Sequence, residues 1–148
     1  MGLAQDVPSA LGQVNPSMFI ISKRFSFCAA HHLSSLPPGH KCRRTHGHNY
    51  EVEVILHGKE LDDHGFVREF DDLDSFQTFI DENLDHRDLC DLRDLPSAST
   101  ENLARYLYVA AHLCCKEVVA VRIHESPKLS AMYVSDQASR DFMDWVTA

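Results

Sequence analysis

Two long segments of the chain alternate apolar and polar residues with the period of a β-strand, at residues 18–30 and 46–57. Successive side chains of a strand point to opposite faces, so each segment buries one face. Two shorter runs, 118–124 and 131–134, have strand-forming composition and are separated by the turn signal Ser126-Pro127. The pattern therefore predicts four strands, two in each half of the chain.

Helical spacing appears between the two pairs of strands. Within 71–84 the apolar residues recur every three or four positions, and acidic residues occupy the first turn, where they favour a helix N-terminus. Those apolar residues are Leu73, Phe76, Ile80 and Leu84. Residues 96–100 supply capping candidates for a second helix, which carries Leu103, Leu107 and Ala111 on one face.

The order strand, strand, helix, helix, strand, strand (ββααββ) predicts an α+β fold, with a four-stranded antiparallel sheet and two helices on one face. We expect residues 1–17 to form a loose N-terminal arm and 18–148 to form a single domain, with a short amphipathic helix over 136–148. The other face of the sheet carries part of the apolar alternation. Assembly of several subunits would cover it.

Composition excludes several classes of function. A net charge of −8 argues against a nucleic-acid partner, and the chain has neither a long apolar run nor a secretory signal. Five cysteines, with Cys114 and Cys115 adjacent, do not form a disulfide framework. We expect a cytoplasmic protein of one domain without a membrane partner.

Three histidines continue buried strand faces. His46 and His48 lie on the same face as Tyr50, and His31 extends the apolar face of the segment 18–30. If these two strands are neighbours, His31 approaches the other two. Three neutral imidazoles with one open position are typical of a catalytic Zn²⁺ site, in which the metal polarises a substrate oxygen or water.

A cysteine lies four residues before His46 in the sequence. Cys42 is flanked by Lys41 and Arg43, and cationic neighbours favour the thiolate, so we interpret it as a catalytic base. The alternative is that Cys42 is a fourth, structural metal ligand.

Other candidate residues lie at the ends of predicted elements. Asp85 and His86 close the first predicted helix. They form either an acid–base pair, or a histidine that the helix dipole favours at this end together with an unrelated aspartate. Glu125 ends the third strand, and its carboxylate can accept hydrogen bonds from the adjacent N–H donors of an aminopyrimidinone ring. An exposed acid at a strand end, without a function, explains the residue equally well. Helix capping alone explains Thr100 and Glu101.

Five segments together resemble the 6-pyruvoyltetrahydropterin synthase / 6-carboxytetrahydropterin synthase family, over about residues 19–134. They are FSFCAAHHL (25–33), GHKCRRTHGHNY (39–50), LDH (84–86), STENLA (99–104) and RIHES (122–126). Five matches in order are far more specific than any one of them.

The resemblance implies a role for each matched residue. The implied zinc ligands are His31, His46 and His48; the implied catalytic residues are Cys42, Asp85, His86 and Glu125; and the implied substrate-binding residues are Glu125, Thr100, Glu101 and Phe27. It also implies the tunnelling fold, in which sheets of a trimer close into a barrel and two trimers form a homo-hexamer. Because the family's sites lie between subunits, Asp85 and His86 are expected to serve a neighbour's zinc.

The spacing between the cysteine and His-Gly-His distinguishes subfamilies. Three residues, Arg43 to Thr45, separate Cys42 from His46, which resembles the 6-carboxy-5,6,7,8-tetrahydropterin synthases; pyruvoyl-type synthases usually have a longer spacing. That subfamily converts 7,8-dihydroneopterin triphosphate to the carboxypterin, acetaldehyde and triphosphate in queuosine or other deazapurine biosynthesis. Two alternatives stay open: a pyruvoyl- or aldolase-type reaction on the same scaffold, and a non-enzymatic zinc-binding module.

Overall fold

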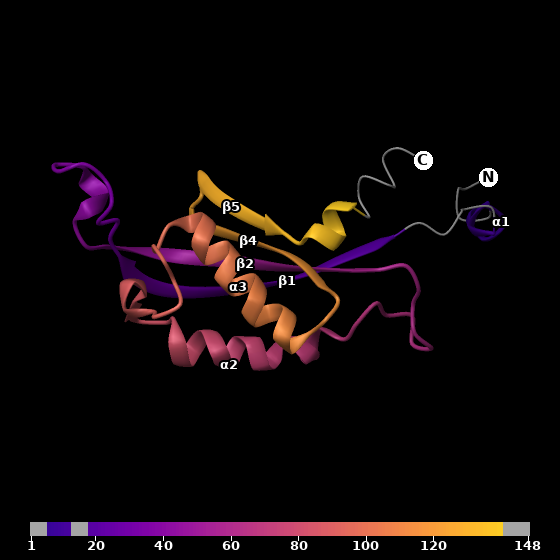
Figure 1. The fold of residues 1–148 in the computed structure, drawn as a ribbon. Coiled ribbons are helices and arrows are strands. Elements are labelled where there is room, and N and C mark those ends of the chain that lie inside the picture. Colours follow the sequence, from indigo (N-terminus) through magenta and orange to yellow (C-terminus); the bar gives the residue numbers. More distant parts are fainter. Residues whose placement is uncertain (1–5, 13–17, 141–148) are drawn as a thin grey trace.

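The computed structural model describes residues 6–12 and 18–140, and its sheet is drawn in Figure 1. The α-helices are α1 (Val7–Leu11), α2 (Asp74–Asn83) and α3 (Thr100–Cys114). The strands are β1 (Phe19–His31), β2 (His46–Gly58), β3 (Arg87–Asp88), β4 (Val118–Ser126) and β5 (Leu129–Val134). Three short 3₁₀ helices are η2 (Lys41–Arg43), η3 (Phe70–Leu73) and η4 (Leu89–Asp91).

The four predicted strands form the body of the sheet, in the order β1-β2-β4-β5, and all three of these pairings are antiparallel. The prediction of four strands omitted a fifth. The two-residue strand β3 pairs in parallel with Ala29 and Ala30 at the outer edge of β1, which makes the sheet mixed. Two residues are too few for alternation to be recognised in a sequence.

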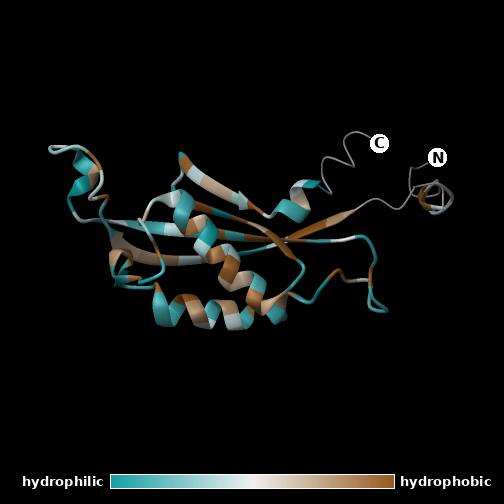
Figure 2. Ribbon diagram, in the orientation of Figure 1, coloured by the Kyte–Doolittle hydropathy of each residue, from teal (hydrophilic) through white to brown (hydrophobic). Residues whose placement is uncertain are grey.

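Helices α2 and α3 cover one face of the sheet, as the sequence pattern predicted (Figure 1). Phe76 and Ile80 are fully buried on α2, and Leu103 and Leu107 are fully buried on α3. They pack with the apolar residues of β1, β2 and β4 in one core, and Figure 2 shows hydrophobic stretches, in brown, along the strands and α3. Burial of this face accounts for the α+β arrangement.

The helix boundaries differ slightly from those predicted. The first turn of the predicted helix over 71–84 is the 3₁₀ helix η3, and the α-helix begins at Asp74. The second helix begins as expected, because Ser99 caps it by accepting a hydrogen bond from the backbone N–H of Asn102.

The two ends of the chain are described in part. The predicted loose arm contains the short helix α1, and its residues 1–5 and 13–17 lie outside the described residues. Residues 136–140 are helical, as predicted, while 141–148 of the predicted C-terminal helix lie outside the described residues. Within 6–12 and 18–140, no helix combines the length and apolar character needed to cross a membrane.

The face of the sheet opposite the helices carries large exposed apolar side chains. Ile20 on β1, and Met132 and Val134 on β5, each expose 40% or more of their surface. Exposed apolar residues on one sheet face are typical of a surface that meets another protein, and this agrees with the expectation that assembly covers it.

Candidate metal centre and active site

Three strands bring their functional ends together at one end of the sheet. β1 ends at His31, β2 begins at His46, and β4 ends one residue after Glu125. Because neighbouring strands run antiparallel, the end of one lies beside the start of the next. The register places His31 directly opposite His46, and Ala29 opposite His48.

The three imidazoles converge as the alternation predicted. The Nε2 atom of His31 lies 3.0 Å from that of His46 and 3.1 Å from that of His48. His31 is buried, and the other two rings are partly buried. Two nitrogens bound to one tetrahedral zinc, with bonds of 2.0–2.1 Å, lie about 3.3 Å apart. The observed separations are close to that value.

Hydrogen bonds at the far side of two rings show which nitrogens are free to bind a metal. The Nδ1 of His31 lies 2.7 Å from the carbonyl oxygen of Ala98, and the Nδ1 of His46 lies 2.7 Å from the carbonyl oxygen of Arg44. A carbonyl only accepts, so each Nδ1 carries the proton and each Nε2 of a neutral ring presents a lone pair. Lone pairs facing each other at 3.0 Å repel unless a cation lies between them. The residues therefore fit a divalent metal ion.

Burial keeps the central imidazole in the form that binds a metal. Removal from water lowers the pKa of His31, and the neighbouring rings of His46 and His48 lower it further, against opposing effects of the Ala98 carbonyl and Glu125. Neutral imidazole is the metal-binding form of histidine.

Cys42 lies in η2 and faces the same cavity as the three histidines, a space of about 560 Å³. Its backbone is fixed on both sides: its N–H donates to Nδ1 of His40 at 3.1 Å, and its carbonyl accepts from the N–H of Leu33 at 2.8 Å. In the described chain, its sulfur does not belong to the group of ligand atoms within 4.8 Å of one another. This arrangement favours a free thiol beside the metal site over a fourth ligand.

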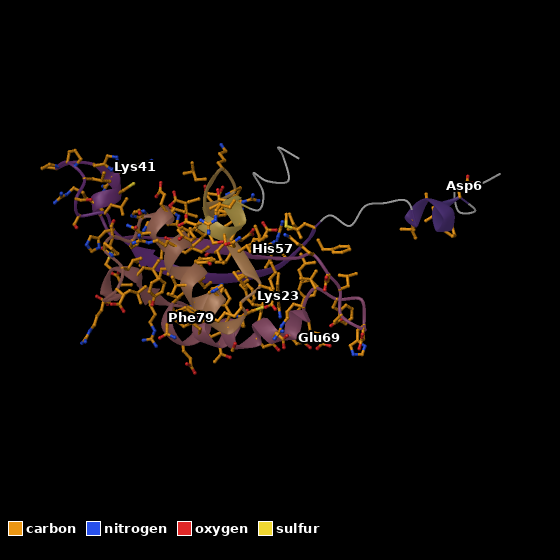
Figure 3. All side chains as sticks on the ribbon, turned by 45° about the vertical axis from the view of Figure 1, so that its right-hand side comes forward. Asp6, Lys23, Lys41, His57, Glu69 and Phe79 are labelled. Carbon is orange, nitrogen blue, oxygen red and sulfur yellow. The ribbon has the colours of Figure 1, made fainter. Side chains whose placement is uncertain are left out.

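The basic residues around Cys42 divide into two groups. Lys41 and Arg44 line the cavity, and Figure 3 shows Lys41 on the loop between β1 and β2, far from Glu69. Arg43 instead donates to the backbone carbonyls of Ser34 and Leu36, so it holds the loop closed.

Glu125 lines this cavity from β4. It sits where the pairing of β4 with β5 shifts register between His124 and Ser126, and such a bulge redirects a side chain. The hydroxyl of Thr100 donates a 2.7 Å hydrogen bond to Oε2 of Glu125. The first residue of α3 therefore positions the carboxylate.

Two of the predicted substrate-binding residues lie elsewhere. Phe27 is 3% exposed and stacks on Tyr50 in the core, with ring centroids 5.0 Å apart. Glu101 is exposed on the first turn of α3. Neither lines the cavity within this chain, so their roles in binding stay predictions.

Asp85 and His86 form the predicted pair, with His86 Nδ1 2.8 Å from Asp85 Oδ2. Asp85 is held by the backbone N–H of Cys28, at 2.8 Å from Oδ1, and this hydrogen bond, followed by that of His86, lowers the pKa of the carboxyl. His86 has a positive φ of 57° and an 81% exposed side chain. A hydrogen bond from its own N–H to the Cys28 carbonyl accompanies this uncommon conformation.

This pair does not join the histidine cluster of its own chain. His86 lines a second pocket with Cys28, Gly47 and Asn49, and His48 borders both this pocket and the one that Cys42 lines. Gly47 and Asn49 alternate with His46 and His48 along β2, so they point to the opposite face of the sheet.

Several groups at the site had no recognisable signal in the sequence. The carbonyls of Ala98 and Arg44 orient two rings, and a backbone carbonyl has no signature in residue type. Tyr50 was expected only to continue the apolar face. Its hydroxyl is buried without a hydrogen-bond partner in the described chain, and its ring centroid lies 5.4 Å from that of His48.

The chain is similar to known proteins over most of its length. Residues 20–136 match the family model described as 6-pyruvoyl tetrahydropterin synthase. A 6-carboxy-5,6,7,8-tetrahydropterin synthase of Bacillus subtilis is 32% identical over 143 residues, covering 88% of this chain and 93% of the relative. The 6-pyruvoyl tetrahydrobiopterin synthase of Drosophila melanogaster is 33% identical over 126 residues, covering 73% of this chain and 74% of the relative.

The fold is similar to a solved structure as well. The 6-pyruvoyl tetrahydropterin synthase of Caenorhabditis elegans superposes with a TM-score of 0.72 at 26% identity, covering 83% of this chain and 99% of that one. The chain therefore belongs to the 6-pyruvoyl tetrahydropterin synthase family.

Proposed function

We propose that this protein is a zinc-dependent 6-carboxy-5,6,7,8-tetrahydropterin synthase. It would convert 7,8-dihydroneopterin triphosphate and one water to 6-carboxytetrahydropterin, acetaldehyde and triphosphate, in queuosine or related deazapurine biosynthesis. The observation that carries the proposal is the convergence of three imidazole Nε2 atoms in a cavity that Cys42 and Glu125 also line.

His31, His46 and His48 would hold the Zn²⁺, which when bound supplies Lewis-acid polarisation of the substrate's side-chain oxygens. Cys42 as thiolate would remove a proton from that side chain, because its fixed backbone places it in the same cavity. Lys41 and Arg44 line this cavity and are the best-placed cations for the triphosphate.

Glu125 would accept hydrogen bonds from the adjacent N–H donors of the pterin ring. Its Oε2 already accepts from Thr100, so the carboxylate is fixed before the substrate arrives. Such positioning of the reacting side chain is worth orders of magnitude in rate.

The Asp85–His86 pair would exchange protons at the site of a neighbouring subunit. Within one chain it lies on the sheet face opposite the histidines, and its histidine is 81% exposed. The exposed apolar side chains on that face support assembly. We propose the homo-hexamer of the family, two trimeric barrels with sites between subunits.

The choice of product rests on spacing and similarity. Three residues separate Cys42 from His46, and the Bacillus subtilis relative, which covers 88% of this chain, is named a 6-carboxy synthase. The Drosophila melanogaster relative, at 33% identity, supports pyruvoyl-type chemistry as the second candidate.

Product analysis tests the choice. The zinc-loaded protein is incubated with 7,8-dihydroneopterin triphosphate, and the pterin products are identified by mass spectrometry while acetaldehyde is measured separately. We expect carboxytetrahydropterin with an equal amount of acetaldehyde. A pyruvoyl product without acetaldehyde would identify the sister activity. No pterin product, together with no binding of the substrate in a separate fluorescence titration, would indicate a non-enzymatic zinc module.

A further inference from the structure

A second group of potential metal ligands lies beside the three-histidine site and has no part in the proposed reaction. It consists of His32, Asp88 and Cys90, whose ring nitrogen, carboxylate oxygen and sulfur lie within 4.8 Å of one another. Imidazole nitrogen, thiolate sulfur and carboxylate oxygen are the three side-chain donors that Zn²⁺ takes.

The fold brings these residues together through the short strand β3. Asp88 pairs with Ala30, two residues before His32, and Cys90 follows in η4. The sulfur of Cys90 is within 3.3 Å of both the backbone N–H and the carbonyl of His32, and the backbone N–H of Cys90 donates to Asp88 Oδ1 at 3.0 Å. Backbone contacts therefore hold the donors in place.

One atom of this group is left without a partner. Nδ1 of His32 is buried and finds no hydrogen-bond partner among residues 6–12 and 18–140. Buried polar atoms are almost always satisfied, and an unsatisfied one in a native protein indicates water or an ion. A ring nitrogen of His32, the sulfur of Cys90 and a carboxylate oxygen of Asp88 lie within 4.8 Å of one another, and together the three donors favour a cation.

The site is accessible and separate from the first. Cys90 is exposed, and His32 and Cys90 line a cavity of about 320 Å³ together with Ser34 and Ser35, while Asp88 borders the pocket that His86 lines. His31 and His32 are consecutive, so their side chains leave the chain in different directions and serve different cavities.

We propose that His32, Asp88 and Cys90 bind a second Zn²⁺, with a water from the adjoining cavity in the fourth position. This ion would join Asp88 and Cys90, which follow the Asp85–His86 pair, to His32, which follows His31. It would fix the acid–base pair relative to the strand that carries a ligand of the first site. The proposal does not depend on pterin chemistry, because the two ligand sets share no residue.

Metal analysis of the purified full chain tests this directly. After loading with zinc and desalting, we expect about two zinc ions per chain in the wild type and about one in Cys90→Ser. His32→Gln should also bind about one zinc ion per chain, and it tests the same site if the Cys90→Ser protein does not fold. Cys114→Ser is the matched control and should bind as many ions as the wild type.

Cobalt substitution identifies the sulfur. A thiolate bound to Co²⁺ gives a charge-transfer absorption in the near ultraviolet, and the three-histidine site has no thiolate ligand. We expect this band in the wild type and in Cys42→Ser, and its loss in Cys90→Ser. A band that is lost in Cys42→Ser and kept in Cys90→Ser would overturn the proposal.

The stoichiometries separate failure of the two sites. A wild type with one zinc ion, lost in His46→Ala and unchanged in Cys90→Ser, would overturn the second site and leave water as the partner of His32. One ion lost in Cys90→Ser and unchanged in His46→Ala would support the second site while contradicting the zinc centre of the proposed function.

Discussion

His31 and His46 face each other as a cross-strand pair with their Nε2 atoms 3.0 Å apart, while each Nδ1 contacts a backbone carbonyl. The carbonyls fix both tautomers so that two lone pairs point at one position. A divalent ion at that position turns a repulsive contact into a stabilising one. Metal binding and the local stability of this end of the sheet are therefore coupled.

Metal removal should destabilise the protein through this site. In a Cys90→Ser background, which retains the three histidines, zinc at about 100 times its Kd stabilises the fold by about 2.7 kcal/mol. This corresponds to a fall in Tm of roughly 5–10 °C on chelation for a domain of this size. Adding His46→Ala should remove the dependence on chelator in thermal unfolding, and His64→Ala, on an exposed loop, should retain it.

Removal of the thiol should separate catalysis from metal binding. We expect Cys42→Ala to lower kcat by about 10²- to 10⁴-fold, the usual contribution of a general base. Its zinc content should equal that of the wild type, because the sulfur lies outside the ligand cluster. Loss of zinc in Cys42→Ala, with Cys114→Ser unchanged, would instead make Cys42 a ligand.

The hydrogen bond between Thr100 and Glu125 should contribute to binding of the pterin ring. Thr100→Val keeps the shape and removes a 2.7 Å bond to a carboxylate, an interaction worth about 1.5–3 kcal/mol. We expect the Kd of the pterin substrate to rise roughly 10- to 100-fold in a fluorescence titration. Thr100→Ser should bind like the wild type, and equal affinity in all three proteins would contradict this role.

The Asp85 carboxylate should give a stability that depends on pH. Hydrogen bonds from Cys28 N–H and His86 lower its pKa in the folded state relative to the unfolded state, so its contribution is complete above the unfolded value of about 3.9. It is lost as the pH falls through the depressed folded pKa. Urea unfolding should therefore show Asp85→Asn less stable than the wild type at pH 7, with a difference that shrinks in strong acid.

A constant difference between these two proteins across the whole pH range would show that the carboxylate's charge has no part in this effect. Ser130→Ala serves as the control, since Ser130 is exposed on β5, does not titrate, and should leave the acid limb of the stability curve unchanged.

Much of the fold followed from spacing along the chain. The apolar positions of α2 and α3, Phe76 and Ile80 on one and Leu103 and Leu107 on the other, were predicted from a period near 3.6 and are fully buried. The strand β3 was missed because it has only two residues, and its pairing with Ala29 and Ala30 depends on where α2 ends.

The sequence alone determined that His46 and His48 share the buried face of Tyr50, and that His31 continues such a face, because the period of a strand is a local property of the backbone. Only the tertiary structure decided that His31 lies opposite His46, that the carbonyls of Ala98 and Arg44 orient their rings, and that His86 faces the other side of the sheet. These relationships depend on strand register and loop closure between distant residues, which the spacing of residue types does not encode.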